Sequence, residues 1–101
     1  MDISWTRQDF GRTPSGDNVE RYEASNGAGM SVGVLTYGGI VQSLRVPDAS
    51  GRAADVVLGF GDLGGYLRGH PYFGAVTGRG AGRITGGKIR VGGREYALAR
   101  N

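Results

Sequence analysis

The sequence predicts an all-β fold of antiparallel strands, most simply as part of a β-sandwich. Two observations support this prediction. Glycine accounts for 21 of the 101 residues, which is typical of a chain with many tight turns at positive φ. Several apolar runs alternate with polar residues at the period of a half-buried strand, and these runs, with 9% aromatic residues, argue against disorder. The length allows one domain at most.

Four candidate strands occupy the first half of the chain, at residues 3–10, 19–25, 30–37 and 40–46. Turn residues separate them. The pair Asn26-Gly27 is a strong hairpin signal before the third strand. After the fourth strand, Pro47 sets φ, Asp48 can cap the turn, and Gly51 can take a positive φ.

The apolar residues of the next strands predict which faces are buried. The residues expected to share one face are Met30, Val32 and Val34 in the third strand, and Ile40, Leu44 and Val46 in the fourth. Residues 54–60 read ADVVLGF, which is nearly continuous apolar sequence. This run predicts a fifth strand that is buried on both faces.

The segment 62–69 is the only candidate helix, with Asp62 as its N-cap. Two internal glycines cost it about 1 kcal/mol each, so we expect a turn or two at most. Residues 70–78 are expected to be extended, because His70 precedes Pro71 and is disfavoured in a helix.

A hairpin is predicted near the end of the chain, where residues 87–91 and 94–99 flank a two-residue Gly-Gly loop. This loop length fixes the register. The predicted pairs are Val91 with Arg94, Arg90 with Glu95, and Ile89 with Tyr96.

Basic residues concentrate in residues 79–101, although the whole chain carries a net charge of only +3. The charged side chains of this segment are Arg79, Arg83, Lys88, Arg90, Arg94 and Arg100, against Glu95 alone. Such a segment can bind an anionic partner, but a solvated strand face is the commoner explanation. The predicted pairing of Arg90 with Glu95 favours the second.

Absent features exclude several classes of protein. The chain has no cysteine, which excludes a disulfide framework and thiolate sites and fits a reducing compartment. The first ten residues have no apolar stretch typical of a signal peptide, and no apolar run is long enough to span a membrane. We therefore expect a cytoplasmic protein with no membrane partner.

The stretch GRGAGRITGGK, residues 78–88, has a composition suited to binding phosphate, nucleic acid or sugar. Gly82 to Lys88 matches G-x4-G-K, but a phosphate loop then needs Ser or Thr and a helix. Here Ile89 and a hairpin follow. Nucleic-acid binding is also disfavoured, because residues 74–95 contain no aromatic residue for base stacking, so we expect no nucleic-acid partner.

Metal and acid–base chemistry lack their usual residues in this chain. His70 is the only histidine, and no acidic residue lies within seven positions of it, so we expect a packed or loop histidine and no metal site. Glu95 is the only acidic residue near residues 78–88 in sequence. A complete acid–base pair is therefore not visible.

Five motifs follow one another between about Phe10 and Asn101: TYGGI, S-L-x-V-P-D-x-x-G, DVVLGF, Y-L-x-G-H-P-Y-F-G-A-V-x-G-R and A-x-R-I. In content, order and spacing they resemble the N-terminal part of the aldose 1-epimerase (galactose mutarotase) family. The resemblance implies that residues 1–101 are an incomplete portion of one large antiparallel β-sandwich domain. An isolated portion of this kind would expose strand edges and core surface, so we expect poor stability.

The resemblance also implies an activity that needs no cofactor. A glutamate deprotonates the C1 hydroxyl of a hexose such as galactose or glucose, and a histidine protonates the ring oxygen. The ring opens, C1–C2 rotates and the ring closes, which interconverts the α and β anomers. The catalytic glutamate and histidines are expected beyond residue 101, so the chain alone is expected to be inactive.

For substrate binding, the resemblance implies that Arg83 contacts sugar hydroxyls beside residue 82. Arginine suits this task because its rigid fork of donors can bind two adjacent oxygens. Gly82 and Gly80 depart from the family, which usually has Asn at the first position and often a larger residue at the second. We expect Arg79 to support the loop. The missing Asn side chain at Gly82 favours an alternative, a non-catalytic carbohydrate-binding or interaction module on the same scaffold.

Overall fold

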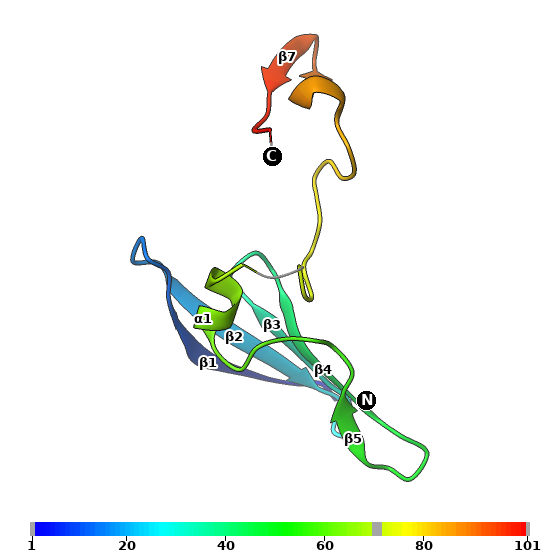
Figure 1. The fold of residues 1–101 in the computed structure, drawn as a ribbon. Helices are drawn as coiled ribbons and strands as arrows, with labels where there is room; N and C mark the ends of the chain where they lie inside the picture. The colour runs from blue at the N-terminus through cyan, green and yellow to red at the C-terminus, as the bar shows by residue number, and fades with distance from the viewer. Residues whose placement is uncertain (1, 70–71, 101) are drawn as a thin grey trace.

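The computed structural model describes residues 2–69 and 72–100, and it contains two antiparallel sheets (Figure 1). Five strands form one sheet in the order β1-β2-β3-β4-β5, and β6 and β7 form a separate hairpin. The elements are β1 (Ser4–Arg12), β2 (Asn18–Ser25), β3 (Ser31–Leu35), β4 (Val41–Pro47), β5 (Ala53–Asp55), α1 (Leu63–Leu67), the 3-10 helix η1 (Thr85–Gly87), β6 (Lys88–Val91) and β7 (Arg94–Ala97). The predicted antiparallel all-β class is confirmed.

Side chains in the turns hold the meander together. The Asn26 carboxamide oxygen accepts hydrogen bonds from the backbone N–H groups of Ala28 (2.8 Å) and Met30 (3.1 Å). The Asp48 carboxylate does the same for Ser50 and Arg52, both at 2.9 Å. The turns predicted at Asn26 and Asp48 are therefore confirmed, each with its hydrogen bonds to the backbone.

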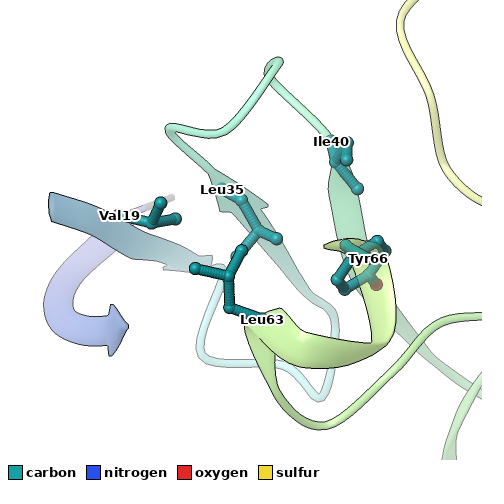
Figure 2. Packing of buried hydrophobic residues seen from close by; sticks show 5 residues of the cluster. All are labelled: Val19, Leu35, Ile40, Leu63 and Tyr66. Carbon is teal, nitrogen blue, oxygen red and sulfur yellow. The ribbon is translucent and has the colours of Figure 1, made fainter. Parts of the chain in front are cut away.

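Helix α1 covers one face of the five-stranded sheet. Asp62 caps it as predicted, because its carboxylate accepts a hydrogen bond from the Gly65 N–H at 3.0 Å. A Cβ at Gly65 would overlap the Phe60 side chain, so a glycine that weakens the helix also lets it pack closely. The cluster under the helix consists of Val19, Leu35, Ile40, Leu63 and Tyr66 (Figure 2).

The prediction that Ile40, Leu44 and Val46 share one face is wrong. The pairing of β3 with β4 shifts where Gly33 pairs with Ser43 but Val34 pairs with Val41, so Gln42 is an extra, bulged residue. Ile40 packs with Leu35 in the core, whereas Leu44 pairs with Val32 on the opposite face. A bulge changes the face on which the following residues lie, which simple alternation cannot predict.

The prediction of a strand buried on both faces at 54–60 is also wrong. Strand β5 ends at Asp55, and Val56 and Leu58 are 63% and 71% exposed. The Asp55 carboxylate accepts hydrogen bonds from the N–H groups of Leu44 (3.1 Å) and Val57 (3.0 Å). The Asp55 side chain thus accepts the Leu44 N–H, which a backbone carbonyl would accept in a continuing strand, and β5 ends there.

The last part of the chain extends away from the sheet. We call residues 75–100 the arm; in Figure 1 it runs from yellow to red, up to the β6–β7 hairpin. The hairpin has the predicted register throughout. The radius of gyration is 17.4 Å, whereas a compact domain of this length would have about 13 Å. The predicted packed or loop position of His70 lies outside the described residues.

Candidate functional site

The arginine loop, residues 78–84, begins four residues after a firm anchor on the sheet. Gly74 accepts a hydrogen bond from the Val41 N–H at 2.9 Å, and a Cβ at Gly74 would overlap the Val41 carbonyl. The Phe73 ring stacks on Phe60, with ring centroids 5.6 Å apart and planes 27° apart. Backbone and aromatic contacts together fix residues 73–74 beside the start of β4, and the chain leaves the sheet after them.

Gly82 provides the bend that precedes Arg83. Its φ is +82°, in the left-handed region, and an added Cβ would meet nothing within 4 Å. Asparagine is among the non-glycine residues that adopt such a φ most readily. Glycine and asparagine therefore both suit the backbone at this position, and they differ in whether a carboxamide extends beside Arg83.

Arg83 and Arg79 are both exposed. Within the described ranges, neither side chain has a hydrogen-bond or ion-pair partner. An arginine has five N–H donors, so both guanidinium groups can bind a ligand without first breaking an internal contact. The loop presents two cations to solvent four positions apart in sequence.

The two sequence neighbours of Arg83 help to line a hollow of about 300 Å³. Gly82 and Ile84 line one part, and Gly87, Leu98 and Arg100 line another. The Leu98 N–H donates to the Gly87 carbonyl at 2.6 Å, which holds the two chain segments together. This volume is at the lower end of the range for small-molecule sites, about 300–1,000 Å³.

A larger hollow of about 600 Å³ lies near the β1–β2 turn. Its polar groups are already engaged with one another: the hydroxyls of Thr13 and Ser15 are 2.9 Å apart, and Ser15 donates to Asp17 at 3.0 Å. These bonds shape the turn. We therefore take the smaller hollow, which the arginine loop borders, as the candidate site.

The perturbed carboxylates lie away from the arginine loop in sequence. Hydrogen bonds from the Ser50 hydroxyl and the Arg52 N–H lower the pKa of Asp48. The N–H groups of Leu44 and Val57 lower the pKa of Asp55. Both carboxylates stabilise backbone. In the described part of the chain, no three His, Asp or Glu side chains gather as a metal site would require.

Sequence reasoning missed one charged residue, Arg21, whose side chain is only 11% exposed. Its Nε donates to Gln42 Oε1 at 2.7 Å, and its Nη2 donates to Ser43 Oγ at 2.8 Å and Glu23 Oε1 at 2.9 Å. The guanidinium lies over Gly33 on the neighbouring strand. A glycine inside a strand often marks such a close approach, and this signal could have indicated the arginine.

A family model described as aldose 1-epimerase matches residues 20–101. Galactose mutarotase of Mus musculus is 46% identical over 100 residues, and that of Homo sapiens 48% over 99 residues. The chain belongs to the aldose 1-epimerase family. It spans 29% of the length of each of these two relatives, and the matches cover 98% and 97% of the chain itself.

The fold of this chain agrees with that of a solved structure. The crystal structure of galactose 1-epimerase from Lactobacillus acidophilus matches with a TM-score of 0.71 at 23% identity. The match covers 99% of this chain and 28% of the other. The fold predicted from the resemblance is thus supported. No helix in the described ranges is long and apolar enough to cross a bilayer.

Proposed function

We propose that this chain is the N-terminal part of an aldose 1-epimerase domain and supplies the arginine loop that binds its hexose. One observation carries the proposal: Arg83 stands exposed and without a partner in the described structure, and its two sequence neighbours, Gly82 and Ile84, line a hollow of about 300 Å³. Family membership makes a sugar such as galactose or glucose the ligand to test.

The proposed task of Arg83 is to hold two adjacent hydroxyl groups of the pyranose. Its donors form a rigid fork that fits two neighbouring oxygens. Hydroxyls away from C1 change little as the ring opens, so this contact binds substrate and transition state about equally. Arg83 then mainly determines KM, with a smaller effect on kcat.

Gly82 and Arg79 have smaller proposed tasks. Gly82 supplies the bend without a carboxamide, which gives up one hydrogen bond to the sugar, worth about 1 kcal/mol. Arg79 keeps the proposed task of supporting the loop, although it has no hydrogen-bond or ion-pair partner in the described ranges. If replacing Arg79 weakened sugar binding more than replacing Arg83, this assignment would be contradicted.

The proposed acid and base lie beyond residue 101. Opening a pyranose requires a base at the C1 hydroxyl and an acid at the ring oxygen, each within hydrogen-bond reach. The two carboxylates with lowered pKa, Asp48 and Asp55, are committed to backbone contacts near β4 and β5. Proton transfer of this kind calls for no cofactor.

Polarimetry tests this division of labour. Fresh α-galactose is mixed with the 101-residue chain, and the change in optical rotation is followed against buffer. We expect equal rates. A catalysed rate that depends on chain concentration would contradict the placement of the acid and base outside these residues. Galactose binding to Arg83 tests the other half of the proposal.

A non-catalytic carbohydrate-binding or interaction module remains the second candidate, because Gly82 lacks the carboxamide that the family usually presents. The coding sequence after residue 101 separates the two. A histidine-bearing L-H-G-G segment followed by a late glutamate supports the enzyme. A continuation without them supports the module.

A further inference from the structure

We propose that Arg21 is a positioning residue that sets where the chain leaves the sheet before the arginine loop. It acts through Gln42, Phe60 and Phe73. Its consequence for sugar binding rests on the proposed function of the loop. The structural part of the inference stands on contacts that connect β2 to the beginning of the arm.

The first contact fixes the bulge in β4. Arg21 Nε donates to Gln42 Oε1 at 2.7 Å, while its Nη2 is held by Ser43 and Glu23 at 2.8 and 2.9 Å. Three acceptors from two strands thus orient one guanidinium. Because Arg21 is largely buried, losing these bonds would leave polar groups unsatisfied, which costs more than losing exposed contacts.

The second contact passes from Gln42 to the segment before α1. Gln42 Nε2 donates to the Phe60 carbonyl at 3.0 Å, and the Phe60 N–H donates to the Tyr66 hydroxyl at 3.1 Å. The same carboxamide therefore accepts from Arg21 and donates to Phe60. At Gly59 an added Cβ would lie 2.7 Å from both the Gln42 carbonyl and the Tyr66 hydroxyl, so this segment has little room to shift.

The third contact reaches Phe73 and Gly74, the two residues directly before the arm. The Phe60 ring carries the stacked Phe73 ring at 5.6 Å. The residue after Phe73, Gly74, accepts from the N–H of Val41, which directly precedes Gln42. Residues 73–74 are thus held twice: directly by the Val41 backbone, and through Phe60, whose carbonyl accepts from the Gln42 side chain that Arg21 orients.

Gly33 offers a way to displace Arg21 without removing it. A Cβ at Gly33 would overlap the guanidinium of Arg21, and the three nearest atoms it would meet all belong to that side chain. Since Gly33 does not have a positive φ, alanine suits its backbone. Gly33→Ala should therefore act on Arg21 specifically and should cost little once Arg21 is replaced.

Amide hydrogen exchange of the 101-residue chain tests the inference without any sugar. In Arg21→Met and in Gly33→Ala we expect the Val41 amide to exchange about tenfold faster, because its bond to Gly74 opens more often. The Leu35 amide, which donates to the Ile40 carbonyl at 2.8 Å in the core, should change less than about twofold. Adding Gly33→Ala to Arg21→Met should bring no further change.

Arg7→Met is the matched control, because Arg7 is an exposed arginine on β1 with only a 3.8 Å approach to Glu20. It should leave both amides unchanged. Equal acceleration of Val41 and Leu35 in the Arg21 and Gly33 variants would mean general destabilisation and would overturn the inference, as would an unchanged Val41. If Arg21→Met does not fold, Gly33→Ala and Arg21→Lys provide the test. In both variants the exchange rate of the Val41 amide is compared with that of the Leu35 amide.

A galactose titration of the same variants separates this inference from the proposed function. If Val41 responds as expected but the unmodified chain binds no galactose, the positioning role stands and the sugar proposal fails. If galactose binds but Val41 does not respond, the positioning role fails and the sugar proposal stands.

Discussion

The five-stranded sheet and the arm are both rich in glycine, but they use it differently. In the sheet and the helix that covers it, Gly33 and Gly65 make room for the side chains of Arg21 and Phe60. In the arm, Gly82 has positive φ and open space around it. Open turn glycines with positive φ occur in both regions, for example Gly27 between β2 and β3, but the glycines that a Cβ would overlap all lie before the arm. The sheet therefore depends on contacts distant in sequence, and the arm on local turns.

Burial shows the same difference. The sheet has a core under α1, built from residues as far apart in sequence as Val19 and Tyr66. Every residue of β7 is exposed, and so is Val91 at the tip of β6. A two-stranded hairpin without a partner is marginally stable at best in water. We expect the stabilities of the two regions to respond independently to mutation, and the following predictions test that independence.

The largest expected effect comes from the core. Leu35 is 1% exposed, so Leu35→Ala should cost about 2–5 kcal/mol of unfolding free energy through lost burial and a cavity. Val91→Ala in the arm should change it by less than about 0.5 kcal/mol. Urea unfolding followed by circular dichroism measures both. Similar losses in the two variants would show that the arm shares the core.

The next effect concerns the helix that covers the core. Asp62→Ala removes the N-cap bond to Gly65 and should cost about 0.5–2 kcal/mol, measured by the same unfolding experiment. Asp2→Ala, an exposed carboxylate near the N-terminus, is the control for charge. If both variants unfold at the midpoint of the unmodified chain, α1 does not stabilise the sheet.

Acid should weaken the sheet before it affects the arm. Backbone hydrogen bonds lower the pKa of Asp55 in the folded state, so its ionised form is favoured by folding. This contribution is present above the ordinary aspartate pKa and is lost as pH falls through the lowered folded-state value. The unfolding midpoint should decline over that range, and Asp55→Asn should reduce the decline. An unchanged pH profile in the variant would contradict the assignment.

The smallest effect on global stability is expected in the hairpin loop. Gly93 has φ +80°, so Gly93→Ala introduces strain and should weaken the β6–β7 pairing by about 1 kcal/mol. NMR contacts between Ile89 and Tyr96 should diminish while the sheet keeps its urea midpoint. A shift of that midpoint would show that the two regions are coupled.

Local chemistry in the sequence was sufficient for the turns. Asn26, Asp48 and Asp62 each hydrogen-bond backbone a few residues away, so their roles follow from nearby sequence. The Gly92-Gly93 loop similarly fixes the hairpin register, which the structure confirms. In each case the interacting groups lie within about ten residues of one another.

Contacts between distant segments were not predictable in this way. The bulge at Gln42 involves Gly33 and Arg21 on two other strands, and it moved Ile40 into the core. The end of β5 depends on the Asp55 carboxylate reaching Leu44. At the candidate site, Arg83 and Gly82 came from the family resemblance. Arg21 was identified from the pairing of β2 with β3, although Gly33 inside a strand is a sequence signal of such a close approach.

The most direct test of sugar binding is an NMR titration of the arginine Nε–H signals with galactose. We expect the Arg83 signal to shift and saturate at concentrations up to about 100 mM. The backbone amides of Gly82 and Ile84, which line the hollow, should shift with it, and their response should be lost in Arg83→Met. Arg90→Met, an exposed arginine on β6, should keep it. No shift of Arg83 across the titration, or an equal galactose response in Arg83→Met, would contradict the account.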